Sequence, residues 1–503
     1  VTINDLSISI GGAFNILGGR SITINGNLNQ NGTLNIISNA TTNGSLILKG
    51  NHTGISNVDY HRYLSTNWHL ISSPISSNNI SDFSGNVNTS GNKYAIAPYK
   101  NNTTELLRWN YYTGVTGVGT GINPLSTAGT FTKAKGYTIQ KSGTGTLNFS
   151  GILNTANSES ILLTDGGVDP AGNRWNLIGS PYTAALEGGN SVPANQTNTF
   201  LKVNASNLDP TRAGLYLWNG SAPYVPKSVD DDFFIAPGQA FFVHAPNGGG
   251  TSASFTEAMQ THQTGNIFLR TSTAYPEMIL QIADDTNTSS TKIRYIQTRT
   301  TGLDVGSDVG TFTGASNNFR VYTHLVSNSE GVDFAIQALP NTGYENMVVP
   351  VGVNAASGKE ITFSLNATNF TSDIKLYLED RSTNTFTRLD EANSNYKITL
   401  TEALNGIGRF YLHTTNSSLS IDQNTSLKNV SIYKLDNTTL RITGLSQGNT
   451  SIKIFTLLGK QVIRNTFISN GVKDISLPKL ATGVYIVQLQ SDSGKMNKKI
   501  ILE

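Results

Sequence analysis

The chain has 503 residues, of which 37% are hydrophobic and only 14% charged, and its length fits three to five domains. A formal net charge of +2, without any cluster of lysine and arginine, excludes the electrostatic footprint of a nucleic-acid-binding protein. The absence of cysteine excludes disulfides and thiolate chemistry, and no apolar run approaches the ~18 residues of a transmembrane segment.

The N-terminal segment, 1–55, consists of short β-prone runs separated by Gly, Asn and Ser. The runs recur every ten to fourteen residues, which favours a β-solenoid-like segment whose coils bury their faces on their neighbours. A set of hairpins in a sandwich is the alternative. The runs are Leu6–Ile10, Ser21–Ile24, Thr33–Ile36 and Ser45–Leu48.

An internal repeat follows this segment. The phrase Trp68–Pro74 returns as Trp175–Pro181, and a second tryptophan and a glycine-led strand follow each copy. A period on the order of 100 residues suits a whole small sandwich. We therefore predict tandem β-sandwich domains at 56–156 and 157–263, and a further β-sandwich domain at 264–416. The best helical candidate, Ser252–Gln263, is short and is expected to be a turn or a strand.

The four tryptophans have two interpretations. A tryptophan that recurs before Leu-Ile in a strand is typical of a core anchor, so we expect Trp68 and Trp175 to be buried. Trp109 and Trp218 each precede an asparagine and are expected to be partly exposed, where they are candidates for contact with a glycan.

Acidic clusters are the candidate metal sites, because carboxylates are the hard oxygen ligands that Ca²⁺ prefers. None matches an EF-hand loop, and solvated loop carboxylates are the alternative. No other cofactor is indicated. The clusters are Asp165 with Asp169, Asp230-Asp231-Asp232, Asp284-Asp285 with Asn287, and Asp304 with Asp308.

Catalytic motifs are not readable in the chain. The seven histidines show no ligand spacing, and neither a nucleophile elbow nor a phosphate-binding loop is present. We therefore predict that the protein is not an enzyme, although a triad assembled from distant strands would not be visible in one sequence.

The end of the chain carries a series of β-strand motifs in a fixed order. Ile454-Phe455 leads into Leu458–Val462, Ile475–Leu477 follows, and Gly483–Val487 precedes the closing Lys498–Ile501. Together these motifs resemble the type A C-terminal sorting domain of type IX secretion cargo.

The resemblance implies an immunoglobulin-like β-sandwich at 417–503 that serves as an export signal. The implied partners are an outer-membrane shuttle barrel, the translocon and a cell-surface sortase that cuts near the polar connector Thr414–Ser418. The protein would reach the surface of a Gram-negative bacterium, or its medium, through the periplasm and outer membrane. Such cargo first needs an inner-membrane signal, so a chain beginning at Val1 is expected to be a processed or truncated form.

We expect the translocation machinery to read turns and a strand edge of this module. The alternative is that these residues serve only the module's own fold. The candidates are Gly459, Gly483, Tyr485, Lys498, Lys499, Ile500, Ile501 and Leu502.

The charge-poor, repeat-built passenger is typical of a binding, adhesion or matrix protein, with a surface glycan or lipopolysaccharide as ligand. A polysaccharide-acting hydrolase and a spacer within a larger surface protein are the alternatives.

Overall fold

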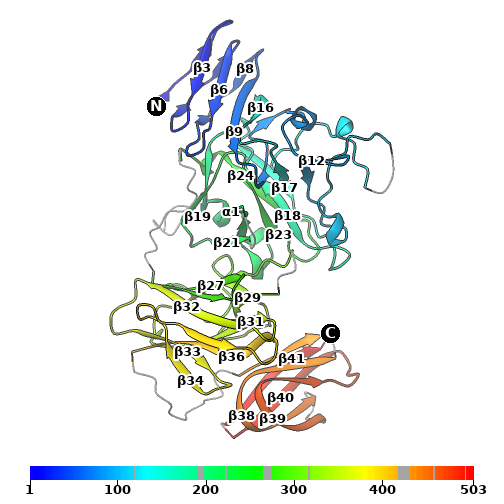
Figure 1. Ribbon diagram of the computed structural model, residues 1–503, viewed down its shortest axis with the longest axis vertical. Helices are drawn as coiled ribbons and strands as arrows, with labels where there is room; N and C mark the ends of the chain where they lie inside the picture. The colour runs from blue at the N-terminus through cyan, green and yellow to red at the C-terminus, as the bar shows by residue number, and fades with distance from the viewer. Residues whose placement is uncertain are drawn as a thin grey trace. The chain divides into compact units, whose positions relative to one another are not determined.

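The computed structural model describes residues 1–117, 121–189, 197–220, 224–263, 275–314, 318–416, 430–436, 438–456, 459–492 and 494–502. The predicted all-β class is confirmed, since almost all regular structure is strand (Figure 1). The one α-helix of the described residues is α1 (Phe200–Asn204), which the sequence analysis did not predict. None of the described helices has the length and apolar character needed to cross a membrane.

The chain divides into two compact units, which are described separately. The first contains Val1–Thr273, Val305–Ser307 and Phe312–Ala315, and the second contains the rest of the chain.

Parallel strands stack in coils at the start of the first unit. Thr2 lies opposite Thr23 and Ser21 opposite Ser45, so strand partners are about twice as far apart in the chain as the predicted runs. The predicted spacing therefore reflects single strands, several of which make one coil. The three parallel stacks are β1 (Thr2–Ile3), β4 (Ser21–Ile24) and β7 (Ser45–Leu48); β2 (Leu6–Ile8), β5 (Leu28–Gln30) and β8 (His52–Gly54); and β3 (Ala13–Ile16), β6 (Thr33–Ile37) and β9 (Val58–Leu64).

The first repeat continues from these coils without a break in packing, because β9 also pairs antiparallel with β16. One hydrophobic cluster runs from Ile8 to Leu153. The elements of this part are β10 (Trp68–Ile71), β11 (Ile75–Ser76), η1 (Ile80–Phe83), β12 (Thr89–Ser90), β13 (Lys93–Tyr94), β14 (Ile96–Pro98), η2 (Glu105–Leu107), η3 (Leu125–Thr127), β15 (Tyr137–Gln140) and β16 (Gly145–Leu153).

The second repeat has its own hydrophobic cluster, which includes Phe200 and Leu201 of α1. Ser252–Gln263 forms a strand and a 3-10 turn, in agreement with the sequence analysis. The elements are β17 (Ser158–Leu162), β18 (Trp175–Gly179), β19 (Ala185–Gly189), η4 (Ala205–Asn207), η5 (Pro210–Arg212), β20 (Leu215–Leu217), β21 (Val225–Lys227), β22 (Phe233–Ile235), β23 (Ala240–His244), β24 (Ser252–Thr256), η6 (Glu257–Met259) and β25 (Gln260–Thr261).

The two repeat phrases form equivalent strands. β10 pairs antiparallel with β15, which places Trp68 opposite Gln140, and β18 pairs antiparallel with β23, which places Trp175 opposite His244. On its other side the glycine-led strand pairs with a third strand, β14 in the first copy and β20 in the second. The sequence repeat is therefore also a repeat of strand pairing.

The copies meet through reciprocal bridges. In the register above, Ile71 corresponds to Ile178 and Lys135 to Gln239. Ile71 bridges Gln239, and Ile178 bridges Lys135. The two bridges therefore join equivalent positions in the two copies, with the roles of the copies exchanged. This exchange indicates an approximate local twofold axis between the two repeats.

The second unit begins with an eleven-stranded, mostly antiparallel sheet. Tyr396 Oη donates to Asp380 Oδ2 (2.7 Å), which joins strands near the two ends of the sheet around one core. The strands are β26 (Glu277–Ala283), β27 (Thr288–Tyr295), β28 (Val309–Gly310), β29 (Arg320–Thr323), β30 (Phe334–Leu339), β31 (Asn346–Ala355), β32 (Glu360–Thr368), β33 (Lys375–Asp380), β34 (Thr385–Arg388), β35 (Tyr396–Thr399) and β36 (Leu404–Thr415).

The connector predicted at Thr414–Ser418 is wrong in its first half. Thr414 and Thr415 end β36, and both are buried because they pair with β31 and β33. Ser417 and Ser418 lie outside the described residues.

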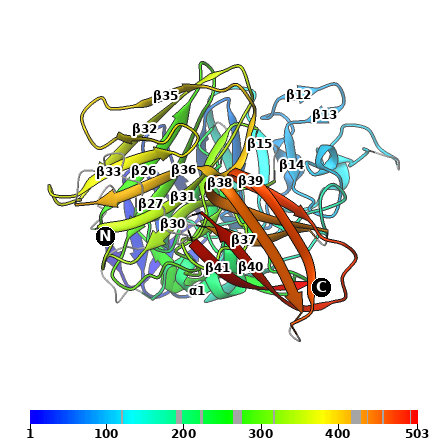
Figure 2. The ribbon, with the colours of Figure 1, turned by 90° about the horizontal axis from the view of Figure 1, so that it is seen from below.

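A small β-module closes the chain. Its long strands β38 and β39 run side by side over most of their length (Figure 2), and β38 pairs first with β37 and later with β40. Its core includes Ile452, Ile454, Val487 and Leu489, all fully buried. The strands are β37 (Ser431–Asp436), β38 (Thr439–Thr456), β39 (Gln461–Ser476), β40 (Gly483–Ser491) and β41 (Gly494–Leu502).

Candidate functional site

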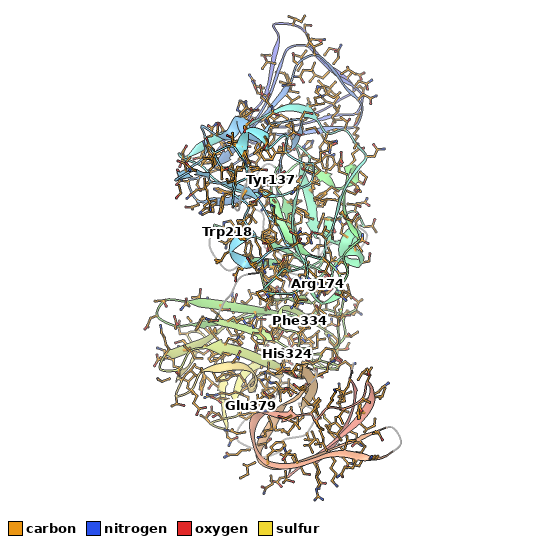
Figure 3. The ribbon with its side chains drawn as sticks, turned by 90° about the vertical axis from the view of Figure 1, so that its right-hand side faces the viewer. Tyr137, Arg174, Trp218, His324, Phe334 and Glu379 are labelled. Carbon is orange, nitrogen blue, oxygen red and sulfur yellow. The ribbon has the colours of Figure 1, made fainter. Side chains whose placement is uncertain are left out.

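An aromatic pocket of about 200 Å³ lies in the first unit, where the two repeats meet. It brings together Trp109 and Trp218, the second tryptophans of the two copies, both half-buried as the sequence predicts. Trp218 is labelled in Figure 3. The described lining residues are Trp68, Leu70, Trp109, Tyr111, Thr138, Trp218 and Tyr224.

The prediction that Trp68 is a core anchor is wrong. Trp68 is half-buried and lines the pocket, whereas Trp175, its equivalent in the second repeat, has no exposed surface and is the predicted core anchor. Rings of Tyr216, His244 and Phe312 pack on Trp175 at centroid distances of 4.7, 4.6 and 4.3 Å.

Ring contacts and one hydrogen bond link the side chains of the pocket. The indole Nε1 of Trp218 donates to the backbone oxygen of Trp68 (2.8 Å), which ties the second repeat to the first. Tyr111 meets Trp68 at 5.9 Å and Tyr224 meets Trp218 at 5.1 Å, while Trp109 packs edge-on against Tyr99 at 5.1 Å. These contacts join the walls of the pocket to both repeats.

Several polar groups of the lining have no partner among the described residues. They are the indole N–H groups of Trp68 and Trp109 and the hydroxyls of Tyr111 and Tyr224. Burial raises the pKa of Tyr111, and burial with the neighbouring Tyr99 and Tyr111 raises that of Tyr224, so both phenols stay protonated at neutral pH. The pocket thus combines apolar ring faces with a few hydrogen-bond donors, a combination typical of small-ligand sites.

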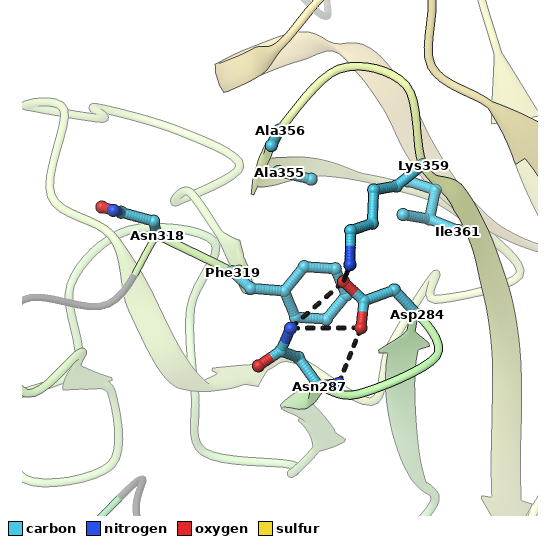
Figure 4. Close-up of a pocket in the computed structure, with 8 residues that line it drawn as sticks. All are labelled: Asp284, Asn287, Asn318, Phe319, Ala355, Ala356, Lys359 and Ile361. Carbon is cyan, nitrogen blue, oxygen red and sulfur yellow. Dashed lines mark hydrogen bonds and ion pairs between the residues drawn. The ribbon is translucent and has the colours of Figure 1, made fainter.

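A second cavity, of about 260 Å³, lies in the second unit at the β26–β27 turn (Figure 4). Its carboxylate, Asp284, accepts bonds from the backbone N–H groups of Thr286 (2.8 Å) and Asn287 (2.7 Å) and lies 3.7 Å from Lys359 Nζ. These bonds, Thr286 first, lower the pKa of Asp284. The Asp284 carboxylate therefore stabilises the turn in which it lies.

The carboxylates predicted as calcium ligands also make local structural contacts. Asp165 accepts from the N–H groups of Gly167 and Gly248, each at 2.8 Å, and Asp169 pairs with Arg108. Within the described ranges, no three His, Asp or Glu side chains gather so that they could hold a metal ion.

The remaining acidic candidates also bond to nearby backbone groups. Asp230 and Asp231 are buried and Asp232 is half-buried, with Asp231 Oδ2 accepting from the N–H of Ser228 (2.8 Å). Asp308 accepts from the N–H groups of Asp304 and Ala338, yet burial raises its pKa to about 7.

The terminal module places the predicted export residues in two groups. Gly459 has φ +82° and donates its N–H to Thr456 (2.9 Å), so the turn after β38 needs a residue without a side chain. Tyr485 is a core residue whose hydroxyl donates to the backbone oxygen of Ala481 (2.8 Å) and is thus already bonded. Gly483 begins β40, and Leu457 and Leu458 lie outside the described residues.

The other group is the terminal strand. Among the described residues β41 pairs only with β40, so it is an edge strand of the module. Ile500 and Leu502 face the core at 6% and 5% exposure, Lys498 is half-buried, and Lys499 and Ile501 point outward, with Ile501 55% exposed. One face of this strand therefore packs in the core, and the other face is accessible to a binding partner.

Family models assign both parts of the chain. A model described as "Domain of unknown function (DUF8693)" matches residues 1–413. The chain belongs to this family. The DUF8693 region contains both repeats, the aromatic pocket and the sheet of the second unit almost to the end of β36.

A second model, the "Secretion system C-terminal sorting domain", matches residues 435–503. This DUF8693 protein is accordingly a cargo of the type IX secretion system, exported through the outer membrane of a Gram-negative bacterium and secreted or displayed on the cell surface.

Two other comparisons add little. No curated protein matches the chain. A polysaccharide lyase of known structure aligns over 45% of this chain and 39% of its own length, at 9% identity and a TM-score of 0.13. So loose an overlap shows neither a shared fold nor a shared activity.

Proposed function

We propose that the DUF8693 region is a carbohydrate-binding passenger, and that the aromatic pocket of the first unit is its ligand site. The observation that carries the proposal is the meeting of Trp109 and Trp218 in one pocket whose lining also holds indole and phenol donors that have no partner among the described residues. Aromatic faces with a few fixed polar groups suit a ligand with both apolar and hydroxyl-bearing surface.

A binding role is favoured over catalysis at this pocket. Its described lining contains no carboxyl or imidazole group, and the two carboxyl groups of a glycosidase or the base of a triad would have to come from there. The volume is below the ~300–1,000 Å³ of sites for drug-sized ligands, so the pocket suits one ring of a glycan.

The test is binding of the full-length protein to surface glycans and lipopolysaccharide on an array, with Trp109→Ala as the pocket variant. Trp109 makes no side-chain hydrogen bond to a described residue, so the variant leaves the Trp218–Trp68 bond in place. Loss of a glycan signal in the variant supports the proposal. Equal signals from the two proteins, or no signal from either, contradict it.

We further propose that the module at the end of the chain is of type A and immunoglobulin-like, and that the shuttle barrel reads the outward face of β41. The open edge and the exposed Lys499 and Ile501 support this. Deleting Lys498–Glu503 is expected to leave the passenger folded but unexported, and normal secretion of that variant would contradict the proposal.

The deletion also removes Ile500 and Leu502 from the core, so a matched pair of point variants separates recognition from folding. Ile501→Ser changes only the exposed face, whereas Ile500→Ser damages the core. Reduced export of a thermally unchanged Ile501→Ser protein supports recognition. Export that is lost only with Ile500→Ser means that the strand serves only the fold.

A further inference from the structure

The two repeats present the same sheet face with different side chains. Across the strands, Trp68 is flanked by Gln140, and Trp175 by His244. Next to them Leu70 lies opposite Thr138, and Leu177 lies opposite Phe242. The third strand adds Ala97 beside Thr138 in the first repeat and Tyr216 beside Phe242 in the second.

These differences leave space on the sheet face of the first repeat and fill the same face of the second repeat with rings. Where the second repeat has the rings of Tyr216, Phe242 and His244, the first has the smaller Ala97, Thr138 and Gln140. The difference accounts for a pocket on Trp68 and a closed aromatic cluster on Trp175.

One further ring closes the second repeat. Phe312 lies on Trp175 with the centroids 4.3 Å apart and the planes inclined by 39°. The described residues put no such ring on Trp68, whose neighbour Tyr111 meets it edge-on at 5.9 Å and 61°. Trp68 instead lines the pocket, so part of its surface faces the cavity.

We infer that the ligand of the pocket is a neutral sugar ring stacked on the indole of Trp68, in the place that Phe312 takes on Trp175. This inference rests on the proposed function and names its ligand class and pose. A pyranose ring offers a C–H-rich face for the indole and a rim of hydroxyls for the donors of Trp68, Trp109, Tyr111 and Tyr224, which the described part of the chain leaves without partners.

The charges and the hydrogen-bond donors of the pocket lining decide the chemical class of the ligand. The described lining carries no cationic side chain, so a uronate would lose its hydration without compensation. Aromatic residues also bind quaternary ammonium ions. A trimethylammonium group, however, accepts no hydrogen bond, so it would leave the N–H and O–H groups of the lining unpaired on binding.

The experiment is isothermal titration calorimetry, which measures the affinity of the full-length protein for cellohexaose, mannohexaose, xylohexaose, hexagalacturonate and choline. Thr138→Phe copies Phe242 of the second repeat and fills the pocket, and Thr146→Phe makes the same change on the exposed face of β16. At least one neutral hexasaccharide is expected to bind, with Thr138→Phe weakening it at least tenfold and Thr146→Phe changing it less than twofold.

Trp68→Phe and Trp68→Ala provide a second series, in case Thr138→Phe disturbs the fold. The phenyl ring is expected to retain part of the affinity and alanine none, with both variants fully folded at the temperature of the titration. Failure of every sugar to bind, hexagalacturonate included, overturns the proposed function itself, and so does binding of choline alone. Neutral binding that is indifferent to Thr138→Phe and Trp68→Ala overturns only the stacked pose, and preference for hexagalacturonate overturns only the neutral class.

Discussion

Trp68 and Trp175 begin the same phrase, occupy equivalent strands and pair in the same register, yet one lines a pocket and the other is wholly buried. Their own sequences do not explain the difference, because both precede Leu-Ile. Their neighbours do: Tyr216, His244 and Phe312 enclose Trp175, whereas the smaller Ala97, Thr138 and Gln140 hold the cross-strand positions beside Trp68. A duplicated motif thus supplies a core anchor in one copy and a candidate binding platform in the other.

The largest expected effect is on stability. Trp175→Ala should lower the unfolding free energy of the first unit by about 3–5 kcal/mol, as for other fully buried aromatic residues. Trp68→Ala should cost less than about 2 kcal/mol, because Trp68 is half-buried and its bond with Trp218 uses the backbone oxygen. Denaturant unfolding, followed by tryptophan emission, measures both losses of unfolding free energy. Equal losses would show that the two tryptophans have the same structural role.

Removing the ring that closes the second repeat should make it resemble the first. Phe312→Ala is expected to cost about 2 kcal/mol, since Phe312 is only half-buried, and to open a cavity over Trp175. A red shift of the emission spectrum would report the newly exposed indole. An unchanged spectrum would show that Phe312 is not what covers Trp175.

His244, which stands where the first repeat has Gln140, should make the second repeat sensitive to acid. Burial lowers the pKa of His244 more than nearby Asp209, at 3.2 Å, raises it. Below the unfolded-state pKa of ~6.5, His244 is protonated in the unfolded chain but stays neutral in the folded protein. Its contribution to the unfolding free energy is therefore fully present above that pH and is lost as the pH drops below it.

His244→Gln copies Gln140 of the first repeat and removes that group. Between pH 5 and 7.5, the melting temperature of the variant is expected to depend less on pH than that of the wild type. The pKa of Asp209 does not interfere. Burial alone would raise it, but His244 and Thr211 lower it, and in the variant the bonds from Thr211 and the ion pair with Arg174 (3.2 Å) still favour the charged carboxylate. Parallel curves would show that His244 does not titrate as its burial implies.

The smallest expected effect concerns a single hydroxyl. Tyr224→Phe keeps the ring that packs on Trp218 and removes a donor that bonds to no described residue, so stability should not change. Affinity for a bound sugar should fall by about 2- to 10-fold, the weight of one neutral hydrogen bond. Unaltered affinity would place the sugar rim away from Tyr224.

The sequence allowed prediction of features that depend on local pattern. Alternating apolar residues marked the strands, the recurring Trp-Leu-Ile phrase marked the duplication, and the ordered motifs from Ile454 onward marked the sorting domain, as its family match shows. The half-buried state of Trp109 and Trp218 followed from the asparagine after each one.

The environment of Trp68 could not be predicted, because it depends on residues far apart in the chain. Ala97 and Thr138 reach it through strand register, and Trp218 reaches it from the other repeat. Phe312, which buries Trp175, comes from a segment that follows both repeats in the chain. The buried ends of β36 were missed for a similar reason: Thr414 and Thr415 look polar in sequence but pair on both sides within a sheet.

The most direct measurement is a crystal structure of the protein with the neutral hexasaccharide that binds it best. The account predicts a sugar ring lying on the indole face of Trp68, in the arrangement that Phe312 adopts on Trp175, with its rim within hydrogen-bond reach of Trp109 and Tyr111. A sugar seated elsewhere, with the face of Trp68 left bare, would contradict it.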